Sequence, residues 1–187
     1  ETNDWDITTD ARPEQVQELF DKVILTGVQH GTVTVVLGNE HYEVTTYRID
    51  VGYSDGRRPD AVQYTTALNE DLARRDFTVN AIAYDPITNR LCDPYNGQAD
   101  LARGLIRAVG QASHRLSEDG LRSFRAIRFA CTLNFDIEAT LADALATTHD
   151  AVRKVSVERI YIELRKTLCS GQAGRGLRLL HSTGLLS

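Results

Sequence analysis

The 187-residue chain has few of the features that mark secreted, membrane or zinc-binding proteins. Its three cysteines, Cys92, Cys131 and Cys169, lie far apart and form no CxxC pair. This spacing argues against a disulfide framework or a zinc site and favours a reducing compartment, so we predict a cytoplasmic protein. The histidines form no ligand-spaced cluster. No apolar run is long enough to span a bilayer and no signal-peptide pattern opens the chain, so we predict no membrane partner.

The charge of the chain is unevenly distributed. The net charge of −5 argues against a nucleic-acid binder. However, residues 151–187 contain seven basic and two acidic side chains, a net +5, which leaves −10 on residues 1–150. A basic end on an acidic body fits a local nucleic-acid footprint beside a carboxylate-rich site for metal ions. A basic helical tail without a partner is equally consistent with this pattern.

The pattern of apolar residues divides the chain near Gly110. Residues 32–37 and 41–48 are rich in β-branched and aromatic side chains and flank a turn at Gly38-Asn39-Glu40, which predicts an antiparallel strand pair. After Gly110 the periodicity is helical. We therefore predict a mixed α/β half followed by an all-helical half, without internal repeats or low-complexity runs.

Two carboxylates near the start of the chain are spaced for one face of a strand. Asp4 and Asp6 stand at i and i+2, so both side chains point to the same side. Such a pair is costly unless a cation lies between them, and carboxylate oxygens suit Mg²⁺. Glu43, on the predicted strand 41–48, is a candidate third carboxylate. An acidic edge strand and a plain surface glutamate are the structural alternatives.

The segment 117–131 combines an apolar and a guanidinium ridge on one predicted helix. Residues three apart are neighbours on a helix surface. The apolar ridge and the adjacent arginine ridge consist of Leu121, Phe124, Ile127 and Ala130, and of Arg122, Arg125 and Arg128. We expect Ser117 to cap the helix, with Asp119 in its first turn. The arginines repel one another, which indicates either a phosphate or nucleotide partner or acidic partners elsewhere in the protein.

Seven segments in chain order resemble motifs of one enzyme family. They are Asp4-Trp5-Asp6, Glu43 to Arg48, Tyr53 to Asp60, Arg74 to Ala81 (RRDFTxNA), Asp93 to Leu101, Glu118 to Phe129 (EDxxRxxRxxRF) and Ser156 to Ile160. Together they resemble the tRNA nucleotidyltransferase / poly(A) polymerase family, most closely its class II, bacterial-type CCA-adding enzymes. The resemblance implies an α/β nucleotidyltransferase (polymerase-β-like) mixed-sheet head over residues 1–110 and an all-helical neck over 111–187, with the nucleotide-recognition helix at 117–131.

The resemblance also implies roles for the acidic residues and for the RRDFTxNA motif. Asp4 and Asp6 would hold two Mg²⁺ ions, and Glu43 would position the attacking 3′-hydroxyl or act as base. Arg75 would contact the triphosphate and Asn80 the ribose. The implied reaction adds C and A from CTP and ATP to the tRNA 3′ end and releases pyrophosphate, a transfer that depends mainly on positioning and charge neutralisation.

The implied roles in the helix 117–131 concern the incoming base. Asp119 would accept from the exocyclic amino group of cytosine or adenine, and Arg122 would donate to the neighbouring ring acceptor. Uracil and guanine present a carbonyl at that place and would leave Asp119 unpaired, which disfavours them. Arg125 and Arg128 would complete the nucleotide pocket or steady the aspartate.

One departure from the family pattern leaves alternatives open. The family places a Gly-Gly-x-x-Arg-Asp segment shortly before the DxD, and this chain has only three residues before Asp4. We expect a piece of a longer protein, truncated at both ends and with little activity alone. The alternatives are a poly(A) polymerase, a specialist for CC or A addition, and a non-catalytic RNA-binding relative.

Overall fold

The computed structural model describes residues 5–52 and 61–186. Two sequence predictions concern residues outside these ranges. They are the metal-binding role of Asp4 and the flexible loop at Tyr53 to Asp60. In the part of the chain that the structure describes, every helix is too short or too polar to span a bilayer.

The chain forms two compact units. Unit 1 comprises Glu1–Val51 and Pro59–Arg74, and unit 2 comprises Gly52–Arg58 and Arg75–Ser187. The change from one unit to the other at Arg74 precedes the point near Gly110 where the sequence becomes helical. The head and neck boundary at residue 110 stays a prediction.

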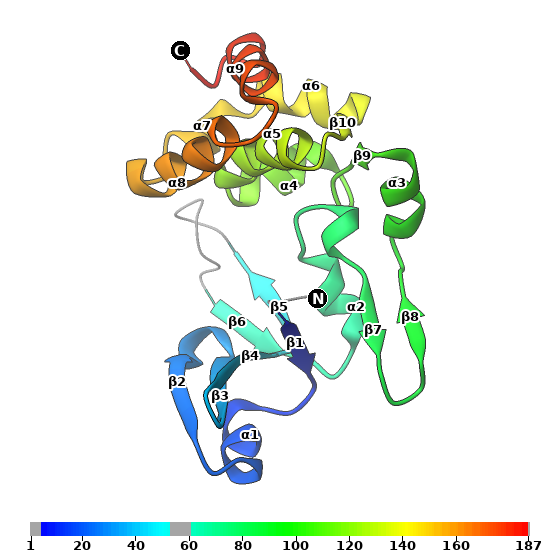
Figure 1. Ribbon diagram of the computed structural model, residues 1–187, viewed down its shortest axis with the longest axis vertical. Coiled ribbons are helices and arrows are strands. Elements are labelled where there is room, and N and C mark those ends of the chain that lie inside the picture. Colours follow the sequence, from blue (N-terminus) through cyan, green and yellow to red (C-terminus); the bar gives the residue numbers. More distant parts are fainter. Residues whose placement is uncertain (1–4, 53–60, 187) are drawn as a thin grey trace. The chain divides into compact units, whose positions relative to one another are not determined.

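Unit 1 is built on a mixed four-stranded sheet in the order β1-β4-β3-β2 (Figure 1). The strands are β1 (Asp6–Thr9), β2 (Val23–Gly27), β3 (Thr32–Leu37) and β4 (Glu40–Thr46). β1 runs parallel to β4, and the other pairs are antiparallel. The predicted strand pair is confirmed, with a turn at Gly38 that has a positive φ of 62°. β2 was missed, because its five residues carry no clean alternation.

One face of this sheet is closed by the helix α1 (Pro13–Leu19), which has proline at its start. Alternate residues of β3 and β4 point inward. The small core that results consists of Val16 of α1 with Val33, Val35 and Val44. The remaining elements of unit 1 are the one-turn helix η1 (Val28–His30), the antiparallel strands β5 (Arg48–Val51) and β6 (Ala61–Tyr64), and the helix α2 (Leu68–Ala73).

Unit 2 begins with short elements that lead into helices. They are η2 (Thr78–Asn80), the hairpin β7 (Ala83–Asp85) and β8 (Arg90–Cys92), α3 (Gly97–Arg103) and β9 (Leu105–Ile106). The six helices after them are α4 (Ala112–Glu118), α5 (Leu121–Thr132), α6 (Ala139–Thr147), α7 (His149–Val152), α8 (Val157–Leu168) and α9 (Ala173–Ser182). The short strand β10 (Asp136–Ile137) pairs in parallel with β9.

The helix α5 lies at the centre of the helical part of unit 2 (Figure 1). It packs against α4, α8 and α9. All four residues of the predicted apolar ridge are buried, and Phe124, Ile127 and Ala130 join Phe77 and Ile106 in the main core. Phe77 also forms an isolated antiparallel β-bridge with Ala108. The α5 helix is thus a fixed platform for the arginines on its adjacent ridge.

The predicted start of this helix at Ser117 is wrong. Ser117 belongs to α4, where its hydroxyl donates to the carbonyl oxygen of His114 (2.8 Å). α4 ends at Glu118 and α5 begins at Leu121, so the single helix expected over 117–131 is two helices.

The break between α4 and α5 has a tertiary cause. Asp119 is extended, with φ −141° and ψ 108°. Gly120 lies so close to another part of the backbone that a Cβ on it would fall 2.4 Å from the carbonyl oxygen of Ala151. This approach, between residues far apart in the chain, sets the geometry of the junction.

Candidate functional site

Two of the three predicted catalytic carboxylates lie next to each other in unit 1. Asp6 of β1 and Glu43 of β4 are register partners in a parallel strand pair, so their side chains stand on the same face of the sheet. Both residues are exposed. Asp4, two residues earlier, is not among the described residues. Carboxylate oxygens on one face suit a hard cation such as Mg²⁺, although within the described ranges no three potential metal ligands form a cluster.

The RRDFTxNA segment opens unit 2 and is organised around Asp76. One Asp76 oxygen accepts from the backbone N–H of Phe77 (2.8 Å) and from Nδ2 of Asn80 (3.0 Å). The other accepts from Nε of Arg125 in α5 (2.7 Å). Asp76 is buried, and Arg75 before it is half-buried. The two predicted nucleotide contacts Asn80 and Arg125 are therefore brought together by a residue to which the sequence assigned no role.

The protonation of Asp76 follows from these contacts. Burial favours the neutral acid, but the charge of Arg125 and the donated hydrogen bonds outweigh it, so the pKa of Asp76 lies below its ordinary value. Asp76 is therefore ionised at neutral pH and holds Arg125 as a charged partner.

Asp119, the predicted reader of the base, lies at the junction of α4 and α5. One of its oxygens accepts from the backbone N–H of Leu121 (3.0 Å), which satisfies a donor in the first turn of α5. The other accepts from NH2 of Arg159 in α8 (3.0 Å). Asp119 thus has a fixed orientation, and Arg159 is a second residue near the site that the sequence did not single out.

Each arginine of the α5 ridge has its own carboxylate partner within unit 2. Arg122 pairs with Glu118 at the end of α4. Arg125 pairs with Asp76 (2.7 Å), and Arg128 pairs with Glu163 of α8. These acidic partners offset the repulsion that the spacing of the arginines predicts, whether or not a nucleotide is present.

Arg128 and Arg125 also lie over the ring of Phe129. The guanidinium carbon of Arg128 is 3.8 Å from the ring centroid and that of Arg125 is 5.3 Å away. Glu163 is buried, so the Arg128 pair is a largely desolvated link between α5 and α8. Contacts of Arg125 and Arg128 with a nucleotide stay a prediction.

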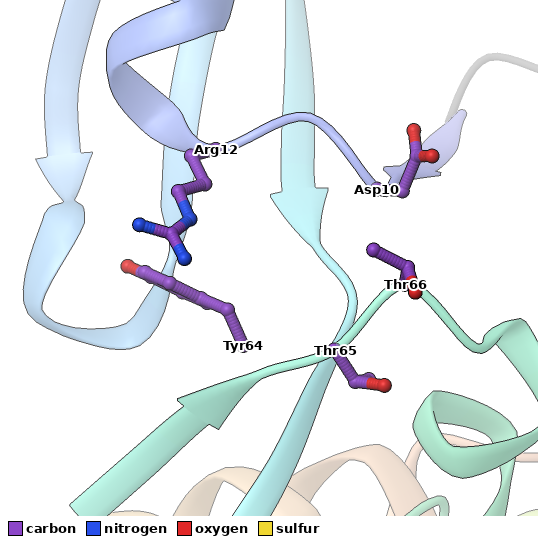
Figure 2. A pocket seen from close by; sticks show the side chains of 5 residues that line it. All are labelled: Asp10, Arg12, Tyr64, Thr65 and Thr66. Atoms are coloured by element: carbon purple, nitrogen blue, oxygen red, sulfur yellow. The ribbon is translucent and has the colours of Figure 1, made fainter.

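A separate pocket of about 320 Å³ lies at the other end of β1 from Asp6 (Figure 2). It is lined by Asp10, Arg12, Tyr64, Thr65 and Thr66. Burial, followed by the charge of Glu14, raises the pKa of Tyr64, so the phenol is neutral at physiological pH. The pocket contains none of the predicted site residues.

The mixed sheet with its acidic pair and the helical part with its paired arginines agree with matches to known families. Residues 1–107 match the sequence profile of the family described as "Poly A polymerase head domain", and residues 134–187 match the one described as "Probable RNA and SrmB-binding site of polymerase A". The first match covers more than half of the chain, and the chain belongs to the poly(A) polymerase head-domain family, with its polymerase-β-like α/β nucleotidyltransferase fold.

Within this family the chain is similar to enzymes that add CCA. A "CCA-adding enzyme" of Lactobacillus helveticus is 50% identical over 164 residues, which are 88% of this chain and 41% of that protein. The crystal structure of the Bacillus stearothermophilus CCA-adding enzyme in complex with CTP is 40% identical, with a TM-score of 0.90. It is matched over 99% of this chain and 44% of its own.

A more distant solved structure is a tRNA nucleotidyltransferase complexed with a primer tRNA and an incoming ATP analogue. It is 26% identical, with a TM-score of 0.79, and the match covers all of this chain and 53% of that one. The chain thus spans about half the length of the relatives that it matches.

Proposed function

We propose that the protein adds C and A to the 3′ end of tRNA from CTP and ATP and releases pyrophosphate. The observation that carries this proposal is the 40% identity, over 99% of the chain, to a CCA-adding enzyme solved with CTP. The partners of the proposed reaction are the tRNA acceptor end and the two nucleoside triphosphates. The wide separation of the three cysteines favours a cytoplasmic location for the protein.

In this proposal unit 1 supplies the acidic residues for the transfer. Asp4 and Asp6 would hold two Mg²⁺ ions, which supply charge neutralisation at the triphosphate and at the attacking oxygen. Glu43, the register partner of Asp6, would orient the 3′-hydroxyl or accept its proton. The shared sheet face of Asp6 and Glu43 supports these roles, because it places both carboxylates where they could act on one reacting centre.

Unit 2 supplies the residues that select the nucleotide. Asp119 would accept a hydrogen bond from the exocyclic amino group of cytosine or adenine, and Arg122 would donate to the adjacent ring nitrogen. Asp119 is held by Arg159, and Arg122 by Glu118, so neither side chain has to reorganise when the base arrives. Fixed donors and acceptors discriminate strongly, since uracil or guanine would set a carbonyl oxygen against the Asp119 carboxylate, and neither group can donate a hydrogen bond.

The other four residues predicted to bind the nucleotide also belong to unit 2. Arg75 would bind the triphosphate and Asn80 the ribose. Arg125 and Arg128 would face the nucleotide with donors other than the Nε–H groups that already bind Asp76 and Glu163.

The proposal is tested by sequencing reaction products. The full-length protein is incubated with Mg²⁺, tRNA lacking its 3′ CCA, and CTP, ATP or both. Addition of C, C and then A is expected when both nucleotides are present. Failure to extend the tRNA would contradict the proposal and favour a non-catalytic RNA-binding relative.

The metal role is tested by chelation and by a matched pair of variants. EDTA and Asp6→Asn are each expected to lower the transfer rate by more than about 100-fold, because charge neutralisation at the phosphates is lost. Asp10→Asn changes another exposed carboxylate just beyond β1 and is expected to keep most of the activity. Equal losses in both variants would contradict a specific role for Asp6.

A poly(A) polymerase is the second candidate, since the matching family profile is described by that activity. This alternative keeps the fold and changes the product. Long A tracts from ATP alone would establish it and displace CCA addition. Addition of only C or only A would indicate a specialist.

A further inference from the structure

The carboxylate of Glu118, at the end of α4, is a point where three basic side chains converge. NH1 of Arg115 lies 2.8 Å from Oε2, and NH1 of Arg122 donates to the same oxygen. Nδ1 of His114 lies 3.3 Å from Oε1. The side chains of Arg115, Glu118 and Arg122 are only 12%, 14% and 10% exposed, so little solvent screens their charges.

Arg115 is itself fixed on its other side. Its Nε donates to the carbonyl oxygen of Val109 (3.1 Å), and the backbone N–H of Val109 donates to the carbonyl oxygen of Asp76 (3.1 Å). Val109 is buried. Arg115 therefore connects Glu118 to a rigid part of the backbone.

Arg122 depends on α4 for its orientation. Its NH1 donates both to the Glu118 carboxylate and to the carbonyl oxygen of Arg115 (2.9 Å). Both acceptors belong to α4, although Arg122 is on α5. An arginine has several rotatable bonds, and two acceptors fixed in space restrict it to one conformation.

We propose that Arg115 is a positioning residue for nucleotide selection. By holding the Glu118 carboxylate, it fixes the guanidinium of Arg122 in the orientation that reads the base edge. Arg115 contacts no nucleotide in this proposal and acts through Glu118. The inference rests on the proposed function, since it assumes that Arg122 contacts the incoming base.

The physical reason is preorganisation. Without Arg115, Glu118 keeps Arg122 as its main cationic partner but loses the contact that fixes its own position. The pair can then move together. A small displacement of a polar group that reads a base edge lowers discrimination more than it lowers binding of RNA, which other surfaces provide.

The test uses the full-length protein, tRNA lacking its CCA end, and kcat/KM for CTP and for UTP. Arg115→Ala is expected to lower the CTP-to-UTP preference by about tenfold and to raise the KM for CTP, with the KM for tRNA unchanged. Arg115→Lys retains a positive charge and is expected to restore part of the preference. An unchanged preference in Arg115→Ala would overturn the inference.

A double-mutant cycle separates positioning from a general structural role. If Arg115 acts through Arg122, then adding Arg115→Ala to Arg122→Ala has no further effect on nucleotide preference. Additive effects on the preference would overturn the inference. If Arg122→Ala alone leaves the preference unchanged, the proposed role of Arg122 fails first, and the inference fails with it.

Arg175 provides the matched control. It donates to the carbonyl oxygen of Phe135 (2.9 Å) and to Asp136 (2.8 Å), much as Arg115 donates to a carbonyl oxygen and a carboxylate. Arg175→Ala is expected to lower the Tm but to keep the nucleotide preference. If it reduced the preference as much as Arg115→Ala, the effect would be one of stability, and the inference would be wrong.

Discussion

At the scale of single residues, Asp76 connects more of unit 2 than its place in the sequence indicates. It accepts hydrogen bonds from its neighbour Phe77, from Asn80 and from Arg125, 49 residues away. A buried carboxylate with these partners stabilises the fold only in its ionised form. Asp76 therefore makes the stability of unit 2 depend on pH.

We predict that Asp76→Asn lowers the free energy of unfolding at pH 7 by about 2 kcal/mol, since charged hydrogen bonds are lost. The pKa of Asp76 is lowered on folding, so its contribution is present above the ordinary carboxyl pKa of about 4 and is lost as the pH falls through the folded value. Urea unfolding between pH 3 and pH 7 measures this. The wild-type protein should lose more stability on acidification than Asp76→Asn, and parallel curves would contradict the assignment.

At the scale of elements, the junction between α4 and α5 depends on a close backbone approach. A Cβ on Gly120 would lie 2.4 Å from the carbonyl carbon and oxygen of Ala151 and 2.5 Å from the nitrogen of Val152. Backbone atoms cannot move aside as a flexible side chain can. Any side chain at position 120 has to separate α5 from α7.

We predict that Gly120→Ala lowers the free energy of unfolding by about 2 kcal/mol, in the range for overpacked sites. The displacement should also raise the KM for CTP, because Asp119 is the adjacent residue. Gly171→Ala is the control, since a Cβ there meets no atom within 4 Å. Chemical denaturation and steady-state kinetics of both variants measure the effects, and equal stability of the two variants would contradict a role for the close backbone approach at Gly120.

The sequence predicted elements where the pattern is local. The strand at Thr32–Leu37 and its return after Gly38 follow from β-branched residues and a turn glycine. The apolar ridge of α5 follows from its spacing. The break before Leu121 was not predictable, because it depends on the contact of Gly120 with Ala151.

In the candidate site, too, the sequence predicted the contacts that follow from local spacing and not those that depend on packing. The proximity of Asp6 and Glu43 follows from the strand positions that the sequence indicated. Glu118 stands four residues before Arg122, a spacing that identifies a helical ion pair, although here the pair spans a helix break. Asp76 and Glu163 lie 49 and 35 residues from their arginine partners, and only the packing of unit 2 identifies them.

At the scale of the whole molecule, the charge distribution indicates which surface would contact RNA in the proposed function. Residues 151–187 have a net charge of +5 on a chain of −5. Arg165 and Lys166 are adjacent and exposed on α8. Contacts with phosphates release counterions, so binding through them weakens as salt is added.

We predict that Arg165→Ala combined with Lys166→Ala weakens tRNA binding and reduces the slope of log K against log salt by about 1 to 2. Titration of tRNA at several salt concentrations measures this slope. The exposed Lys22 of unit 1 serves as the control, and Lys22→Ala is expected to leave the slope unchanged. Identical slopes for the wild-type protein and the double variant would exclude this face of α8 as a surface that contacts tRNA phosphates.

Nucleotide selection by protein side chains at the α4–α5 junction is the core of the proposed function. It is tested most directly by offering each of the four nucleoside triphosphates to the full-length protein with tRNA lacking CCA and sequencing the ends. We predict that the wild-type protein adds only C, C and A, and that Asp119→Ala also incorporates U or G while transfer continues. A folded, active Asp119→Ala variant with unchanged nucleotide choice would contradict it.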